Sequence, residues 1–141
     1  MSLRKAATRS VRAMSRIVSI QTKSAPAPAA PYSQAIKANK MVFVSGQIPY
    51  TADFKPIEGS MGDKAEQVIK NVSNILQEAN SGLHNVVKVN VFMSDLKYFE
   101  EFNTVYARYF AELKPARSCL AAKALPLNVD VEMEVIALEN E

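Results

Sequence analysis

Two segments near the C-terminus carry the residues best suited to chemistry. Arg117 and Cys119 are two positions apart, so their side chains share one face if the segment is a strand. An arginine guanidinium can bind a carboxylate through two parallel hydrogen bonds. Glu132 and Glu134 have the same spacing, and a carboxylate in a pocket can order or deprotonate a water molecule. Taken alone, however, such residues are more often a surface ion pair and solvated strand glutamates.

The histidine and cysteine counts limit the chemistry further. The chain has one histidine, His84, and one cysteine, Cys119, so it cannot build a zinc site of the usual His/Cys kind. The same counts exclude an internal disulfide and acid–base chemistry that needs two histidines. No phosphate-binding loop, metal-binding motif or Ser-His-Asp pattern occurs in the sequence. A lone cysteine suits a reducing compartment.

The net charge of +3 comes from the first 15 residues. They hold four of the 17 basic residues (Arg4, Lys5, Arg9 and Arg12) and no acid, which leaves 13 basic and 14 acidic residues from Arg16 onward. The rest of the chain therefore has a net charge of −1. A nucleic-acid-binding domain normally carries its own positive patch, so nucleic acid is not expected as a partner.

The same 15 residues have the composition of a mitochondrial transit peptide. On a helix, Leu3, Ala7, Val11 and Met14 would share one face and the basic side chains another, with serine and threonine between them. The pattern predicts import into the mitochondrial matrix, and a disordered basic tail is the alternative. Translation from Met14 would omit the leader and give a cytosolic form. No run approaches the roughly 18 apolar residues of a membrane helix, so no membrane association is expected.

Hydrophobic periodicity predicts two helices and five strands. An apolar stripe at helical spacing runs from Asp63 to Ala79 and ends at Asn80-Ser81-Gly82. A second helical region follows Asp95, carries an aromatic stripe and ends at Pro115. Strands are expected at residues 16–22, 41–45, 86–93, 118–124 and 130–138, with Val87, Val89, Val91 and Met93 on one face of the third.

This element order predicts an α+β fold, in which two amphipathic helices lie on one face of a mostly antiparallel sheet. Residues 24–31 contain three prolines and are expected to be extended, and residues 53–62 are expected to form a loop. The length allows one domain, over residues 16–141, after the 15-residue leader.

Seven sequence blocks, in the same order, resemble the RidA (YjgF) family of imine deaminases. They are APAPAAPYSQAI (residues 25–36), FVSGQIP (43–49), AEQVIKNVSNIL (65–76), VVKVNVFMSDL (86–96), FNTVY (102–106), PARSC (115–119) and VEMEVIAL (131–138). The resemblance begins near Arg16 and continues to the C-terminus, and the leader is most similar to those of the family's mitochondrial branch in fungi. Seven blocks in order are a specific signal, whereas PARS alone would be a weak one.

The resemblance implies a chorismate-mutase-like fold, a homotrimer with clefts between subunits, and no metal or cofactor. It also implies a small-molecule substrate, 2-aminoacrylate or 2-aminocrotonate, which pyridoxal-phosphate dehydratases release from serine and threonine. The enamine becomes an imine, and water converts the imine to a 2-keto acid and ammonia. Such an activity would protect branched-chain amino-acid biosynthesis.

The resemblance also assigns catalytic roles. Arg117 is expected to hold the substrate carboxylate. Glu132 is expected to position the attacking water or to pass a proton to departing ammonia. Cys119 is expected to line the cleft, with its backbone more than its thiol, although a small buried hydrophobe is an equal alternative for this side chain.

Four further residues are expected to bind substrate. Gly46 would let backbone approach the ligand, with Ser45 beside it. Tyr32 would form a lid over the cleft, and Asn103 would hydrogen-bond near it. The alternatives are that Gly46 only forms a turn and that Tyr32 and Asn103 only pack against their neighbours. Two rival functions remain, a ribonuclease or translation inhibitor and a non-catalytic holdase; the near-neutral domain and single histidine count against the first.

Overall fold

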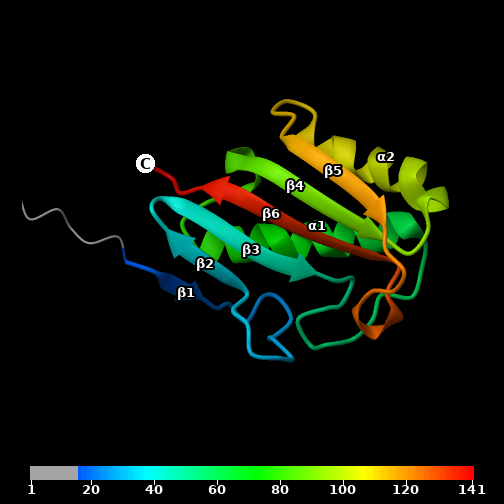
Figure 1. Ribbon diagram of the computed structural model, residues 1–141, viewed down its shortest axis with the longest axis horizontal. Helices are drawn as coiled ribbons and strands as arrows, with labels where there is room; N and C mark the ends of the chain where they lie inside the picture. The colour runs from blue at the N-terminus through cyan, green and yellow to red at the C-terminus, as the bar shows by residue number, and fades with distance from the viewer. Residues whose placement is uncertain (1–15) are drawn as a thin grey trace, which may run out of the picture.

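Six strands form one sheet, with two helices against it, in this computed structural model, which describes residues 16–141 (Figure 1). The strands are β1 (Val18–Ile20), β2 (Ala35–Ala38), β3 (Met41–Gln47), β4 (Val86–Met93), β5 (Ala116–Ala121) and β6 (Val131–Leu138). The helices are α1 (Met61–Glu78) and α2 (Phe99–Phe110). The leader predicted over residues 1–15 lies outside the described residues.

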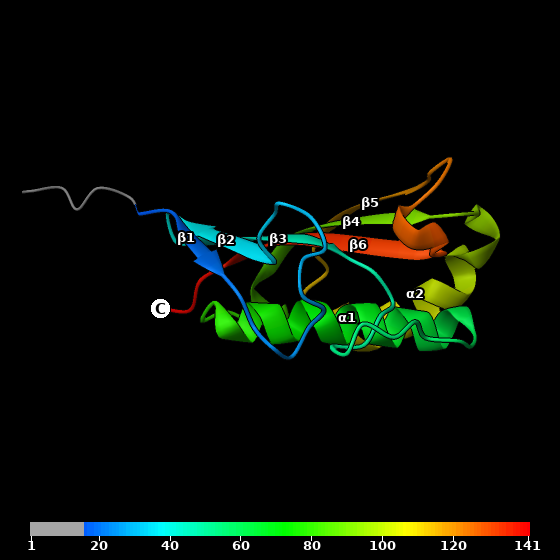
Figure 2. The same cartoon turned by 90° about the horizontal axis from the view of Figure 1, so that it is seen from below.

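The strand order in the sheet is β1-β2-β3-β6-β4-β5. β4 and β5 run parallel, and the other four pairings between neighbouring strands are antiparallel. Both helices cover the same face of the sheet (Figure 2). The predicted α+β fold, with a mostly antiparallel sheet and two helices on one face, is therefore confirmed. No helix within residues 16–141 is long and apolar enough to cross a membrane.

The longer helix, α1, begins at a capping box. The Ser60 hydroxyl accepts a hydrogen bond from the Asp63 amide, and the Asp63 carboxylate accepts one from the Ser60 amide, both at 3.2 Å. The predicted apolar stripe is buried against the sheet, as Val68, Val72 and Ile75 show. The amphipathic helix predicted for residues 63–79 is confirmed, with a start two residues earlier.

Helix α2 is confirmed as well, but it ends at Phe110 rather than at Pro115. Residues 111–115 instead form the bend that leads into β5 at Ala116, and Lys114, the residue before Pro115, disfavours helical backbone. β5 starts two residues earlier than predicted, because it pairs in parallel with β4 from Lys88 onward. These shifts bring the start of β5, and Arg117 with it, close to α2.

Two strand predictions were incomplete or wrong. β2 was not predicted, because Ala-Ile-Lys-Ala has weak strand propensity and its hairpin lacks the usual glycine: Asn39 and Lys40 take the positive φ values, 51° and 60°. The prediction that Val87 shares a face with Val89 is wrong. A register shift between Val86 and Lys88 buries Val86 and leaves Val87 exposed.

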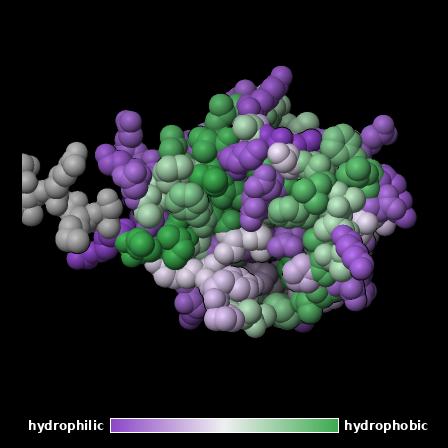
Figure 3. All heavy atoms as spheres, in the orientation of Figure 1, coloured by the Kyte–Doolittle hydropathy of each residue, from purple (hydrophilic) through white to green (hydrophobic). Residues whose placement is uncertain are grey.

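The two faces of the sheet differ in cover. Side chains on the helix side, such as Val42, Val91 and Met133, form the core and are fully buried. The opposite face has no covering helix, and Phe43 and Leu120 remain 42% and 47% exposed there. Figure 3 views this uncovered face and shows apolar residues spread over it. An apolar sheet face of this kind normally packs against another surface.

Candidate functional site

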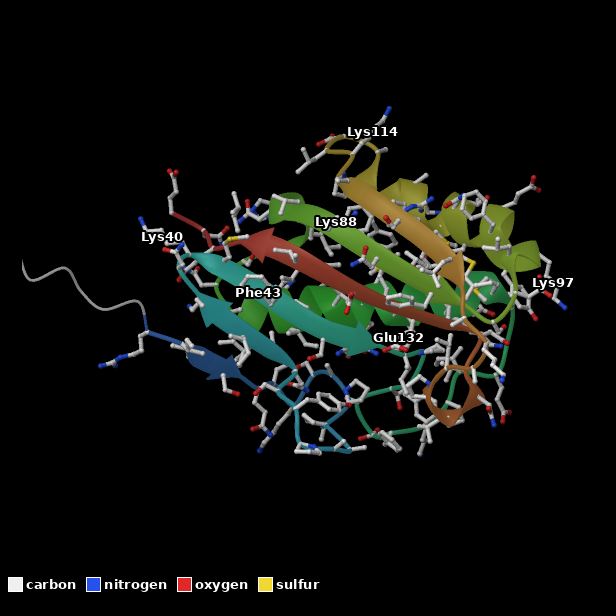
Figure 4. The ribbon with its side chains drawn as sticks, viewed as in Figure 1. Lys40, Phe43, Lys88, Lys97, Lys114 and Glu132 are labelled. Carbon is white, nitrogen blue, oxygen red and sulfur yellow. The ribbon has the colours of Figure 1, made fainter. Side chains whose placement is uncertain are left out.

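A concavity of about 650 Å³ opens on the uncovered face, where β3 and β6 meet three loops. Four of the seven predicted site residues line it: Tyr32, Ser45, Gly46 and Glu132. Figure 4 places Glu132 on β6, beside the C-terminal end of β3. The remaining lining consists of Glu134 and the apolar residues Ala29, Ala30, Ile48, Phe54, Pro126 and Leu127. The cavity therefore combines a few polar groups with a mostly apolar wall, as small-molecule sites do.

A bulge at the end of β3 brings Gly46 against Glu132. The pairing of β3 with β6 shifts between Val44 and Gln47, so the intervening residues lie out of register. A Cβ atom on Gly46 would lie 2.8 Å from Cδ of Glu132. The carboxyl group thus occupies the space that a side chain would need. Because φ of Gly46 is not positive, the close approach of Glu132 is what requires glycine here.

Ser45 connects the bulge to the loop that carries Tyr32. Its hydroxyl donates a hydrogen bond of 2.6 Å to the Ser33 carbonyl, and its amide donates one of 2.9 Å to the Gln34 carbonyl. Its hydroxyl hydrogen is therefore already used. The buried side chain of Gln34 donates to the Pro26 carbonyl at 2.9 Å and holds the same loop. This anchoring fixes Tyr32, which is half exposed, at the rim of the concavity.

The Glu132 carboxyl group is electrostatically unusual. Burial raises its pKa, and the negative charge of Glu134 on the same strand face raises it further. Glu134 is held by Asn90 of β4, whose side-chain amide donates a hydrogen bond of 3.0 Å to it. A carboxylate with a raised pKa accepts protons more readily, which suits a group that activates water.

Arg117 lies elsewhere, on β5 against α2. Its guanidinium donates a hydrogen bond of 2.7 Å to the side-chain oxygen of Asn103. Its central carbon also lies 4.6 Å from the ring centroid of Tyr106 and 5.6 Å from that of Phe99. The three α2 residues are spaced four and three apart, so they share one helix face. One face of α2 therefore fixes the orientation of the guanidinium.

No carboxylate within residues 16–141 makes an ion pair with Arg117, and the first 15 residues contain no acid. The ion-pair alternative for Arg117 is therefore not observed. Cys119, two residues along the strand, packs against the core, and burial raises its thiol pKa while Arg117 acts in the opposite direction. Burial therefore disfavours the nucleophilic thiolate, which agrees with a packing role for the side chain.

The predicted residues form two groups on opposite faces of the sheet. Arg117 pairs in parallel register with Val89, which is buried under the helices. Glu132 pairs with Phe92, which alternates with the buried Val91 and so points to the uncovered face. Within one chain, Arg117, Cys119 and Asn103 are thus separated by the sheet from the concavity that holds Glu132.

Sequence reasoning missed several residues that shape these groups. Gln34 lies inside a recognised sequence block, but nothing in its spacing shows that it is buried and anchors a loop. Tyr106 and Phe99 read as part of the aromatic stripe of α2, and their spacing from Asn103 is the signal that could have linked them to Arg117. Phe54 and Leu127 carry no sequence signal because both lie in loops.

The family model described as endoribonuclease L-PSP matches residues 22–139. The mitochondrial protein MMF1 of Saccharomyces cerevisiae is 61% identical over 128 residues, which cover 91% of this chain and 88% of that protein. The chloroplastic Reactive Intermediate Deaminase A of Arabidopsis thaliana is 45% identical over 121 residues, 84% of this chain and 64% of that protein.

Solved structures agree with these matches. The crystal structure of yeast Mmf1 is 62% identical and superposes with a TM-score of 0.87, covering 89% of this chain and all of that one. The crystal structure of TdcF from E. coli with bound serine is 35% identical, with a TM-score of 0.83 over 87% of this chain and 99% of that one. From the family model, these identities and the shared fold, we conclude that the chain belongs to the RidA (YjgF) family.

Proposed function

We propose that the protein is a hydrolytic deaminase of reactive 2-imino acids, the tautomers of 2-aminoacrylate and 2-aminocrotonate. The observation that carries the proposal is the state of Arg117. Its guanidinium is oriented by Asn103 and two aromatic rings, yet no carboxylate of residues 16–141 pairs with it. A half-buried, fixed arginine without an acidic partner is suited to binding the carboxylate that every 2-imino acid carries.

Glu132 supplies the second requirement, a group that handles protons next to the reacting carbon. Water adds to the C=N carbon, the C=N π pair moves to nitrogen, and Glu132 accepts the proton that the water loses. Glu132 then returns this proton to the nitrogen, which gives a carbinolamine. The C–N bond breaks, the hydroxyl passes its own proton to the leaving nitrogen and becomes the keto group, and ammonia departs. Because an imine is already electrophilic, orientation of water and substrate provides much of the rate.

A second copy of the chain is needed to unite the two groups, because the sheet separates Arg117 from Glu132 within one copy. The uncovered face offers apolar side chains to such a partner, among them Phe43, Leu120 and Leu138. We therefore include in the proposal a homotrimer, in which Arg117, Cys119 and Asn103 of one subunit complete the concavity of its neighbour. In this proposed arrangement, all seven residues would lie at one site.

The proposed place of action is the mitochondrial matrix. The acid-free, amphipathic leader over residues 1–15 supports import, and the yeast relative that is 61% identical is named mitochondrial. Protein that starts at Met14 would remain in the cytosol. In either compartment, the substrate would come from dehydratases that release enamines from serine and threonine.

The proposal is tested with purified protein and an imine made in the assay. A threonine dehydratase releases 2-aminocrotonate, and the rate of ammonia and 2-ketobutanoate formation is followed with and without the protein. Acceleration by wild-type protein, lost in Glu132→Gln, is expected. If the rate stays at the uncatalysed value, the deaminase proposal is wrong. RNA cleavage by the same sample, resistant to salt and lost on substitution of His84, would favour a ribonuclease instead.

A further inference from the structure

Two apolar residues at the rim of the concavity have left-handed backbone. The φ angles are 62° at Phe54 and 55° at Leu127. Within residues 16–141 the other non-glycine residues with positive φ are three asparagines, which tolerate this region, and Lys40 in a hairpin turn. Phe54 and Leu127 are thus the apolar residues among those with positive φ, and both line the same concavity. Such backbone costs free energy and is concentrated at functional sites.

Local hydrogen bonds hold both residues in place. The Phe54 amide donates to the Thr51 carbonyl at 2.8 Å, and the Phe54 ring lies 5.1 Å from that of Tyr50. Leu127 lies in a turn closed by the Asn128 amide. Despite this fixed backbone, Phe54 is 45% and Leu127 57% exposed, so neither side chain serves the core. Both side chains line the concavity, where a bound ligand would meet their apolar surfaces.

We infer that Phe54 and Leu127 are specificity-determining residues, which contact the substrate side chain and select 2-imino acids with aliphatic side chains. This inference rests on the proposed deaminase function. The groups assigned to the invariant part of the substrate are on strands, Arg117 for the carboxylate on β5 and Glu132 for the reacting carbon on β6, whereas Phe54 and Leu127 come from two loops. What varies between 2-imino acids is the side chain, and the wall of the concavity that remains for it is apolar.

Charge strengthens the selection. Glu132 and Glu134 both line the concavity, and the lining contains no basic residue of this chain. An imino acid with an acidic side chain would lose hydration against the apolar rim and meet two carboxyl groups. We therefore expect the order of preference to be leucine-derived imine over alanine-derived imine over aspartate-derived imine.

The test compares imino acids made in the assay by D-amino-acid and D-aspartate oxidases from D-leucine, D-alanine and D-aspartate, since the imine carbon has no handedness. The variant Leu127→Gly removes the side chain while glycine adopts φ 55° without strain. Asn128→Gly is the matched control, because Asn128 has the same φ of 55° in the same turn but does not line the concavity.

We expect Leu127→Gly to lower the ratio of kcat/KM for the leucine-derived over the alanine-derived imine on the order of tenfold, with an unchanged or higher Tm and unchanged assembly mass. Phe54→Gly should act in the same direction, and Asn128→Gly should leave the ratio unaltered. An equal loss on both imines, or loss of the assembly, would overturn the inference and assign the rim to folding or to subunit contact. Wild-type protein inactive on every imine would instead refute the proposed function.

Discussion

The carboxyl group of Glu132 rests against the backbone of Gly46, with its Cδ 2.8 Å from the position that a Cβ atom would take. The bulge in β3 creates this approach, because it moves Gly46 out of register with β6. Glycine is therefore required at this position by the location of a neighbouring carboxyl group. The proposed catalytic carboxylate can take its position only because residue 46 has no side chain.

Gly46→Ala should remove activity while leaving the fold intact. The added methyl group must displace the Glu132 carboxyl, which is the end of a flexible side chain and can rotate away at low cost. A displacement of about 1 Å in a catalytic group can lower the rate on the order of a hundredfold. Steady-state kinetics and thermal unfolding measure the two effects. Gly62→Ala is the control, since its Cβ would meet its nearest neighbour at 3.4 Å, and it should keep full activity.

Glu132→Gln should lower activity and raise stability at neutral pH. Because burial raises the folded-state pKa of Glu132, the folded protein binds this proton more tightly than the unfolded chain. The contribution of Glu132 to the free energy of unfolding therefore falls as pH rises from its unfolded-state pKa to its folded-state pKa. Above that range the charged carboxylate disfavours the folded state. The variant should melt higher than wild type at pH 7 and equally below the ordinary glutamate pKa of about 4.3. A lower Tm at pH 7 would contradict this account.

Sequence periodicity was sufficient to predict the helices and strands that bury a regular stripe of apolar side chains. α1 and β6 satisfy this condition, and their predicted faces agree with the structure. β2 does not, because an alanine-rich strand of four residues is defined by its partners rather than by its own pattern. Register shifts such as the one beside Val87 are likewise set by pairing across the sheet.

The candidate site was predictable only as a list of residues. Sequence blocks indicate Arg117 and Glu132, but not that the sheet separates them, because strand order is a property of the whole fold. The support of Arg117 by Tyr106 depends on how α2 packs over β5. The loops that carry Phe54 and Leu127 meet at the concavity only in three dimensions.

Arg117→Lys should nearly abolish deamination without unfolding the protein. Lysine keeps the charge but loses the planar fork, the stacking on Tyr106 and the geometry of the bond to Asn103. We expect kcat/KM to fall on the order of a hundredfold and Tm to change little. Arg108→Lys is the control: Arg108 lies on α2, pairs with Glu66 of α1 at 3.0 Å and lies outside the concavity. More than half of wild-type kcat/KM in Arg117→Lys would remove the main support for the proposal.

Any RNA binding by residues 16–141 should be weak and lost in moderate salt. From Arg16 onward the chain has 13 basic and 14 acidic residues, so few phosphate contacts are available, and such contacts weaken steeply with ionic strength. Titration of labelled RNA at increasing salt concentrations measures this. Tight binding that persists in high salt would disagree with the charge distribution.

Two inactive variants should restore activity when they assemble together, because each proposed cleft takes Arg117 from one subunit and Glu132 from its neighbour. Arg117→Lys and Glu132→Gln chains are co-expressed with different tags and purified through both tags, so that every assembly contains both kinds. In a cyclic trimer of either mixed composition, one cleft receives both intact residues, one lacks one of them and one lacks both, so activity should recover to about one-third of wild type. Separately purified variants mixed without exchange serve as the control and should stay inactive. Mixed assemblies that form but remain inactive would show that the two residues do not meet across a subunit boundary.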